Sequence, residues 1–524
     1  MIIFILFIMT IFYMLSFLLN KFTSSKLVPP LPPGPTPLPY IGSLISMLRN
    51  KPTFRWIHRM MDEMNTKILC VRLGNVYVIS VSDPKIALEF LKDIDRIFSS
   101  RPDSMSAYLT SDGYLDTVLA PMGDHWKMMK KVLSSEILSV ARHKWLLNKR
   151  REEDDNILRY INNQCQKNIG VMISGLVNVR IIGQQYSSNM IRKLMFGSRY
   201  FGKGSIDGGP GEEEIEHADS LSTILGYVYA FCVTDYIPCL RWITDFDGHE
   251  KGIRKAILTA RKYQDPLIDE MIQQWKDGVR AEQEDLLDIF INLNNPPLNA
   301  GEIKVQILDL ILAAYINVSN NIEWAMGEMM NNPRLFDKAV HELDMVVGMD
   351  RLVQESDLHS LNYIKACVKE ALRLHPVAPF NLPHVTTADS TVAGYFIPKG
   401  SHVMVSRIGL SRNPEVWDDP LTFNPDRHMS GSKEVVLTDN NLHTFSFSTG
   451  LRGCPGVLLG STMTTMLLAR LVQGFTWELP PNEPHVDLKE NLHDLAKAKP
   501  LFALAKPRLP SHIYLTLDYD GNVN

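Results

Sequence analysis

The sequence predicts a mainly α-helical protein with a minor β portion, preceded by an apolar segment at the N-terminus. Three observations lead to this fold class. Apolar residues recur at helical spacing through most of the chain, strand-like alternation is confined to short runs, and the 524 residues are 45% hydrophobic and 21% charged, as in a globular protein with a substantial core. The net charge of −4 gives no reason to expect a nucleic-acid partner.

The N-terminal segment has the properties of a membrane anchor. Residues 1–19 carry no charge and consist mainly of Ile, Phe, Leu and Met, and about 20 apolar residues suffice to cross a bilayer as a helix. A cleaved signal peptide is the alternative, but a charged region before this stretch and a small-residue cleavage site after Leu19 are both missing. We therefore expect a transmembrane anchor at residues 1–20.

A hinge follows the expected anchor. Lys21 and Lys26 favour a cytosolic location for the chain that follows the span. The prolines that crowd residues 29–39 cannot continue a helix and form a semi-rigid spacer. We expect a basic and proline-rich hinge at residues 21–40 and one large domain at residues 41–524, facing the cytosol, where its free thiols stay reduced.

Individual elements of this domain are indicated by local signals. Short strands are expected at 69–81 and at 391–397, where a Pro-Lys-Gly turn follows the second. One helix is expected to begin at Pro333, with Asn332 as its N-cap. Others are expected at 363–375 and at 457–473, the last ended by Gly474.

Cys454 is the one cysteine of six with unusual neighbours, because residues 447–456 read Phe-Ser-Thr-Gly-Leu-Arg-Gly-Cys-Pro-Gly. The three glycines allow this backbone to approach a large planar group closely. The sulfur lies just before a predicted helix, whose N-terminus favours thiolate over thiol, and Arg452 can offer a positive charge to an acidic partner. A buried free cysteine beside a glycine-rich turn is the plain alternative.

The pattern Phe-x-x-Gly-x-Arg-x-Cys-x-Gly is similar to the cysteine-ligand signature of the cytochrome P450 superfamily. The resemblance implies the P450 fold, heme b (iron protoporphyrin IX) as cofactor and Cys454 as the axial thiolate ligand of the iron. It also implies that Phe447 and Arg452 contact the heme. A thiolate ligand pushes electron density onto heme iron and favours cleavage of the O–O bond.

Two further motifs stand in the order that the superfamily has. Glu370 and Arg373 share one face of a predicted helix, and Arg427 lies in a later Pro-Asp-Arg-His element. The resemblance implies that these three side chains lock together beneath the heme in a structural role.

Other residues resemble the superfamily's propionate contacts. Trp126 and Lys130 look like a Trp-x-x-x-Arg helix with Lys in place of Arg, and His384 stands where many relatives have arginine. Lys127 and Lys131 form a neighbouring basic stripe, which is either a solvated face or a docking surface for an acidic reductase.

The match can be narrowed to the plant branch of amino-acid N-monooxygenases, which form aldoximes. Members of this branch hydroxylate the α-amine of an L-amino acid twice with O2 and NADPH-derived electrons, and loss of CO2 and water gives the aldoxime for glucosinolate, cyanogenic-glucoside or related pathways. The resemblance implies NADPH–cytochrome P450 reductase as partner and a single-pass location in the endoplasmic reticulum membrane. It is carried by the segments at 235–238, 248–251, 353–357, 370–385, 393–400 and 412–417.

The sequence departs from the superfamily in the helix expected to cross the heme. Ile316 and Asn317 occupy the places of the acid and the threonine that relay protons to bound dioxygen, and the branch itself lacks the threonine. We therefore hypothesise that Asn317, Ser319 and ordered water assist oxygen activation. Leu451 is a second departure, since the branch usually has a basic residue there; this change would weaken contact with a propionate or the reductase.

Three other activities stay open at this point: a monooxygenase acting on another small metabolite, a heme-thiolate isomerase or dehydratase that needs no external electrons, and a non-enzymatic membrane scaffold. For the favoured activity, the segment at 101–122 is expected to form part of the substrate pocket. Phe380 and the residues around Tyr315 favour an apolar or aromatic substrate, with phenylalanine first and aliphatic or tryptophan-like side chains close behind.

Overall fold

The computed structural model describes residues 29–166, 174–205, 207–242, 245, 248–429, 434–481 and 483–518. The expected anchor at 1–20 lies outside these ranges, as does most of the expected hinge. Within them, no helix combines the length and the apolar character needed to cross a membrane.

The described chain is mainly helical. Its N-terminal half contains α2 (Leu44–Arg49), α3 (Thr53–Glu63), α4 (Pro84–Leu88), α5 (Asp95–Phe98), α6 (Met105–Thr110), α7 (Asp124–Val132), α8 (Val140–Trp145), α9 (Leu147–Gln166), α10 (Val179–Phe196), α11 (Glu212–Val228) and α12 (Val233–Tyr236). Its C-terminal half contains α13 (His249–Lys276), α14 (Leu286–Ile291), α15 (Ala300–Asn331), α16 (Pro333–Val346), α17 (Asn362–Leu374), α18 (Arg407–Ser411), α19 (Val457–Gly474) and α20 (Ser511–Leu515).

The strands form small sheets. The largest described sheet has the order β1-β2-β7-β4, with β1 (Ile68–Leu73), β2 (Val76–Val81), β4 (His384–Val385) and β7 (His402–Val405). In this sheet β2 and β7 are parallel, and the other pairs are antiparallel. The smaller sheets are β3-β9-β8, made of β3 (Leu176–Asn178), β8 (Phe475–Glu478) and β9 (Phe502–Pro507), and the hairpin of β5 (Ser390–Val392) and β6 (Tyr395–Ile397).

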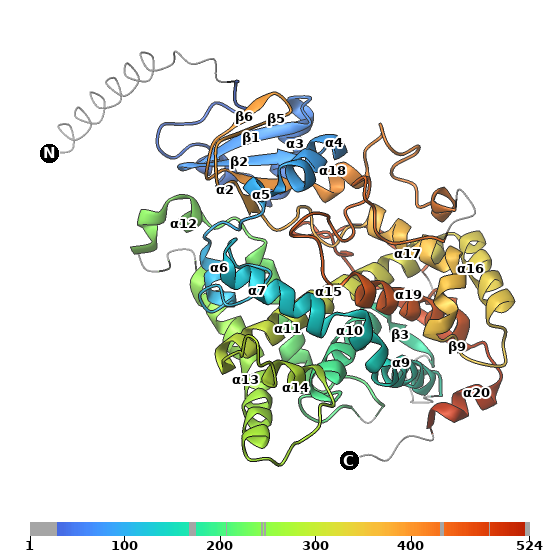
Figure 1. Ribbon diagram of the computed structural model, residues 1–524. Coiled ribbons are helices and arrows are strands. Elements are labelled where there is room, and N and C mark those ends of the chain that lie inside the picture. The colour runs from blue at the N-terminus through green and yellow to red at the C-terminus, as the bar shows by residue number, and fades with distance from the viewer. Residues whose placement is uncertain are drawn as a thin grey trace, which may run out of the picture.

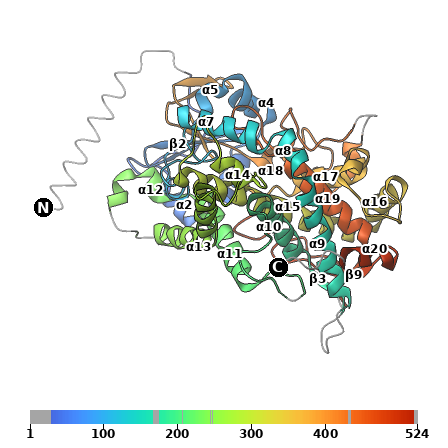
Figure 2. The same cartoon turned by 60° about the horizontal axis from the view of Figure 1, so that its bottom comes forward.

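The long helix α15 runs through the interior of the helical body (Figure 1), where α10, α13, α17 and α19 pack against it. The β1-β2-β7-β4 sheet lies at one end of the molecule together with α3, α4 and α5. Figure 2, turned by 60°, again places α10 beside α15. One large core cluster joins the helices, and two smaller clusters lie around the sheet. The helix α19, which follows Cys454 in the chain, therefore packs against α15.

Most element predictions are confirmed. The expected strands are the hairpins β1-β2 and β5-β6, and the expected helices are α16, α17 and α19. α16 begins at Pro333, but Asn332, at the N-cap position, makes no capping hydrogen bond with its side chain. Asn332 is therefore the N-cap residue by position, as expected, without the side-chain bond. Asn299 does cap α15, because its side chain accepts the Glu302 amide while Glu302 accepts the Asn299 amide.

Candidate active site

Two stretches of the interior have solvent-accessible side chains. Ala313 and Asn317 are exposed although most of α15 is buried, and they lie four residues apart on one face of the helix. Cys454 is also accessible, just before the helix α19 that packs against α15. We call the accessible face of α15 at Ala313 and Asn317 the interior surface, because the rest of this helix is largely buried.

The loop that carries Cys454 is closed by backbone hydrogen bonds. The Cys454 amide donates to the Phe447 carbonyl at 2.9 Å, and the Gly453 amide donates to the Gly450 carbonyl at 3.0 Å. Gly450 has a φ of +74°, and a Cβ at that position would overlap the Leu91 carbonyl oxygen and the Asp95 carboxylate. Glycine is therefore required there both by conformation and by close approach.

Opposing effects act on the charge of the Cys454 sulfur. Burial raises the pKa of the Cys454 thiol, and this effect outweighs the Gly456 amide and the Arg407 charge, which lower it. Gly456 is the N-cap residue of α19, so the helix N-terminus acts in the expected direction. The Gly456 amide at the start of α19 therefore favours the thiolate, while the enclosure of the sulfur favours the thiol.

Arg452 and Trp126 form the centre of a basic cluster beside the loop. The Arg452 guanidinium lies 4.2 Å above the Trp126 ring and donates to the carbonyl oxygens of Ser99 at 2.7 Å and Ala120 at 2.6 Å. The Lys130 ammonium lies 5.2 Å from the centre of the same ring. The structure therefore brings Trp126, Lys130 and Arg452 together, as expected for heme contacts.

His384 belongs to the same region, close to the guanidinium groups of Arg101 and Arg452. Its Nδ1 donates to the Phe98 carbonyl at 2.9 Å. Burial and the nearby guanidinium groups of Arg101 and Arg452 lower the pKa of His384 well below its usual value. With Nδ1 bonded to the Phe98 carbonyl, Nε2 is the ring nitrogen that remains for another contact.

Arg101 is the cation that sequence reasoning did not single out. Its guanidinium donates to the carbonyl oxygens of Val118, Leu382 and Pro383, directly before His384. Burial lowers the pKa of Arg101 to about 10. A single arginine before a proline has no pattern that marks it as a ligand contact, so only the fold could identify it.

The donor set fits heme. Burial first, and then the charge of Arg101, lower the pKa of Arg452 to about 8, so Arg101 stands close enough to disfavour the charge of Arg452. Two carboxylates such as the heme propionates would relieve this repulsion. An accessible thiol in a glycine-rich loop, with the Phe447 ring against Gly460 at the start of α19, completes a set suited to a planar iron cofactor.

Glu370, Arg373 and Arg427 meet in the core. Arg373 donates to both carboxylate oxygens of Glu370, at 2.7 and 2.8 Å, and Arg427 donates at 3.0 Å. The structure adds His428, whose Nε2 lies 2.7 Å from the same carboxylate. Although burial raises it, the pKa of Glu370 falls to about 2, because Arg373, His428 and the Asn424 amide favour the ionised form. Removing this carboxylate would leave buried cations without a partner.

Asn317 and Ser319 point to different sides of α15. The Asn317 amide donates to the Ala313 carbonyl at 2.7 Å, and the residue is exposed on the interior surface. Ser319 is buried, its hydroxyl donates to the Tyr315 carbonyl at 3.1 Å, and its Cα lies against Gly183 of α10. Only Asn317 therefore borders the interior surface; Ser319 lies at the α10 contact.

The residues that favoured an apolar substrate also lie outside this surface. Phe380 is buried and stacks on His58, with ring centres 4.9 Å apart. Tyr315 is buried as well, and its hydroxyl accepts from Ser222 of α11 at 3.4 Å. Neither ring lines the space next to Asn317, so the substrate preference loses the support that these residues gave it.

Asp309 lies about two turns before Asn317 on the same face of α15, but it is buried. Its carboxylate accepts from the Val118 amide at 3.2 Å, and Asp116 accepts from the Leu119 amide at 2.8 Å. Burial raises the pKa of Asp116 to about 6, and burial together with the Asp116 charge raises the pKa of Asp309 well above its usual value. The segment at 116–120 is thus fixed between α15 and the basic cluster.

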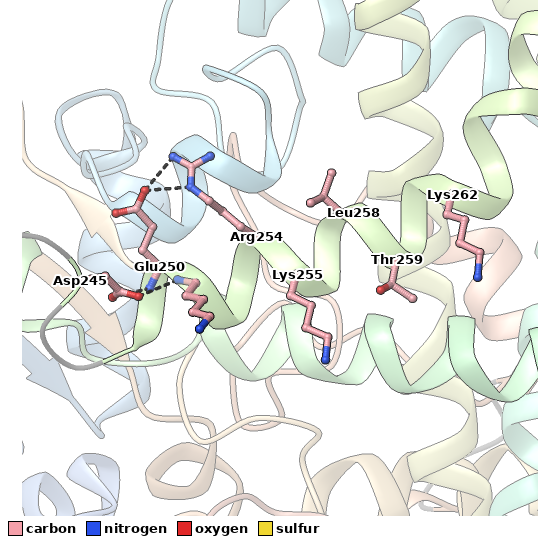
Figure 3. A pocket seen from close by; sticks show the side chains of 8 residues that line it. Asp245, Glu250, Arg254, Lys255, Leu258, Thr259 and Lys262 are labelled. Carbon is pink, nitrogen blue, oxygen red and sulfur yellow. Dashed lines mark hydrogen bonds and ion pairs between the residues drawn. The ribbon is translucent and has the colours of Figure 1, made fainter.

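A shallow surface pocket on α13 is a separate feature (Figure 3). Figure 3 shows Arg254 paired with Glu250, while Lys255, Leu258 and Lys262 follow along the exposed face of the helix. None of the residues expected to contact heme or oxygen lines this pocket. It does not contribute to the candidate active site.

Comparisons with known proteins agree with the site. The family model described as "Cytochrome P450" matches residues 32–505. Valine N-monooxygenase 1 of Manihot esculenta is 54% identical over 501 residues, covering 95% of this chain and 91% of the relative. Phenylalanine N-monooxygenase of Arabidopsis thaliana is 52% identical over 492 residues, 93% of each chain. Tryptophan N-monooxygenase 1 of the same plant is 50% identical over 498 residues, 94% of this chain and 91% of the relative. The chain belongs to the cytochrome P450 family.

Proposed function

We propose that this protein is a heme-thiolate monooxygenase that N-hydroxylates an L-amino acid twice, using O2 and NADPH-derived electrons, to give an aldoxime with loss of CO2 and water. The observation that carries the proposal is identity of 50–54% along nearly the whole chain with N-monooxygenases of three different amino acids. Such aldoximes enter glucosinolate, cyanogenic-glucoside or related pathways.

We assign the heme contacts to one side of the site. Cys454 is the proposed axial ligand, and the proposed propionate contacts come from the basic cluster. Heme bound through a thiolate supplies the activation of dioxygen. The residues proposed to surround it are Trp126, Lys130, His384, Phe447 and Arg452, and Arg101 joins them because its guanidinium lies beside His384. Glu370, Arg373 and Arg427 act structurally.

On the other side of the site, Asn317 is the proposed polar group nearest the reacting atoms. Its amide is tied to the Ala313 carbonyl, which holds the side chain along the helix and leaves it on the interior surface. Ile316 is only partly buried and offers no proton. A role for Ser319 is restricted to shaping α15, since its hydroxyl is bonded within the helix.

For the whole chain we propose a transmembrane anchor at 1–20, a hinge at 21–40 and a heme-binding catalytic domain at 41–524 on the cytosolic side of the endoplasmic reticulum membrane. The uncharged N-terminal stretch and the lysines and prolines after it support this organisation. NADPH–cytochrome P450 reductase is the proposed electron donor, and the exposed Lys127 of α7 is one candidate contact.

The test is a panel of L-amino acids incubated with full-length protein in membranes, the reductase and NADPH, with oximes detected by mass spectrometry. We expect an oxime from at least one amino acid with an apolar or aromatic side chain, and valine, phenylalanine and tryptophan are tested first. Samples without NADPH or without reductase serve as controls. Product that forms in these controls would instead support an isomerase or dehydratase, and a heme-loaded protein that makes no oxime from any amino acid would contradict the proposal.

A further inference from the structure

The peptide groups of Leu451 are held from two directions. Its amide donates to the Asp95 carboxylate, and its carbonyl accepts from the Lys130 ammonium. Asp95 comes from α5 and Lys130 from α7, and both elements lie more than 300 residues earlier in the chain. Leu451 stands three residues before Cys454, in the middle of the loop that presents the sulfur.

Within the described ranges, the Leu451 amide is the one hydrogen-bond donor to the Asp95 carboxylate. The residue is buried, and its second oxygen, Oδ1, lacks a hydrogen-bond donor within the described part of the chain. The loop approaches it so closely that a Cβ on Gly450 would overlap the carboxylate. A buried carboxylate is costly unless it is bonded or near positive charge, and Lys130 and Arg452 provide that charge.

The side chain of Leu451 takes no part in this arrangement. It is 36% exposed, whereas both backbone groups of the residue are bonded to buried or partly buried charged groups. The loop therefore stays anchored although residue 451 has no basic side chain, because Asp95 and Lys130 bind backbone groups. Backbone hydrogen bonds from Gly453 to Gly450 and from Cys454 to Phe447 connect Leu451 to the residue that carries the sulfur.

We propose that Asp95 is a positioning residue for the heme ligand: together with Lys130 it clamps the Leu451 peptide groups and thereby sets where the Cys454 sulfur stands relative to the iron. This inference rests on the proposed heme role of Cys454 and goes beyond it. Asp95 does not touch the cofactor or the substrate in this proposal. It acts through the loop, so its loss changes the ligand geometry before it changes substrate binding.

The experiment compares Asp95→Ala and Asp95→Asn with the unmodified enzyme. Hydrogen–deuterium exchange of loop peptides around Leu451 measures the clamp directly, and the spectrum of the reduced carbon monoxide complex reports the thiolate ligand. Because charge-assisted hydrogen bonds are roughly twice as strong as neutral ones, we expect exchange to rise on the order of tenfold in Asp95→Ala and less in Asp95→Asn. The thiolate-type Soret band should weaken in the same order.

Asp93→Ala is the matched control, since Asp93 is an exposed acid two residues away. It should leave exchange and spectrum unchanged. A folded Asp95→Ala protein with the loop exchange and spectrum of the control would overturn the proposal. If Asp95→Ala does not fold, Asp95→Asn alone is the test. Loop exchange and a spectrum equal to those of the unmodified enzyme would then overturn the proposal. These readouts need no substrate, so failure of the clamp and failure of the aldoxime proposal are separate results.

Discussion

The two sides of the candidate heme site are built in different ways. On the side of Cys454, charged side chains from distant elements bind backbone groups: Asp95 and Lys130 hold Leu451, and Arg452 holds three carbonyls. On the side of α15, Asn317 and Ser319 bond to carbonyls of their own helix. The ligand side is thus fixed by long-range contacts, whereas the oxygen side is fixed by the course of one helix.

The largest expected effect tests the ligand side. Replacing Cys454 with Ser should remove the thiolate-type Soret band of the reduced carbon monoxide complex and abolish oxime formation, because a hydroxyl is a poor donor to heme iron. Absorbance spectra and the oxime assay measure this. Cys165→Ser is the control, since the Cys165 sulfur bonds to the Ala505 carbonyl at 3.2 Å and belongs to neither side of the site. A normal spectrum in Cys454→Ser would contradict the assignment.

The support beneath the ligand side gives the next largest effect. Glu370→Gln leaves Arg373, Arg427 and His428 around a neutral amide, and breaking a buried ion pair by removing one partner costs about 3–5 kcal/mol. Urea unfolding at neutral pH measures the loss. Since the folded pKa of Glu370 is about 2, its contribution should be present above about pH 4.5 and should disappear as the pH falls toward 2.

Asp426→Asn is the control for this substitution. Asp426 lies in the same short segment as Arg427, but it forms an exposed pair with Lys338. An exposed pair contributes about 0–1 kcal/mol, so this variant should unfold close to the unmodified protein. If Glu370→Gln and Asp426→Asn lowered the free energy of unfolding equally, the buried charge of Glu370 would not be the cause of the loss.

The same contrast explains what sequence could predict. Cys454, Arg452 and Glu370 with Arg373 belong to motifs with fixed spacing, and the elements that carry them lie where their local signals indicate. Arg101 and Asp95 have no such pattern, because their roles depend on carbonyls and amides of segments far away in the chain. Ser319 was expected beside Asn317, but two residues turn a helical side chain by about 200°, so it faces α10 instead.

A smaller effect is expected on the oxygen side. Asn317→Ala removes the polar side chain from the interior surface, and general acid assistance is worth about 10²-fold or more when it is direct. We expect a loss of about tenfold in oxime formed per NADPH oxidised, because an amide acts through hydrogen bonds and does not ionise. Ser319→Ala, the matched control on the buried face, should change coupling by less than about twofold. Unchanged coupling in Asn317→Ala would remove Asn317 from the mechanism.

The smallest effect concerns the segment at 116–120, which touches both sides. Asp116 and Asp309 are buried near each other, and their raised pKa values mean that the folded protein binds more protons than the unfolded chain. Stability should therefore fall as the pH rises from about 4 through about 6, the pKa of Asp116. Asp309→Asn keeps an oxygen for the Val118 amide and removes one of the two like charges.

For Asp309→Asn we expect the free energy of unfolding to depend less steeply on pH. Near neutral pH we expect it to rise by up to about 1 kcal/mol. One pKa unit corresponds to about 1.4 kcal/mol, and the gain stays below this because burial, which the substitution leaves in place, accounts for most of the pKa shift of Asp116. Urea unfolding at several pH values measures both. Asp269→Asn, which removes an exposed acid from α13, should leave the slope unchanged. If Asp309→Asn instead lowers the free energy of unfolding at neutral pH, the charge of Asp309 stabilises the fold as a counter-charge to Arg101. The segment at 116–120 would then belong with the ligand side of the site.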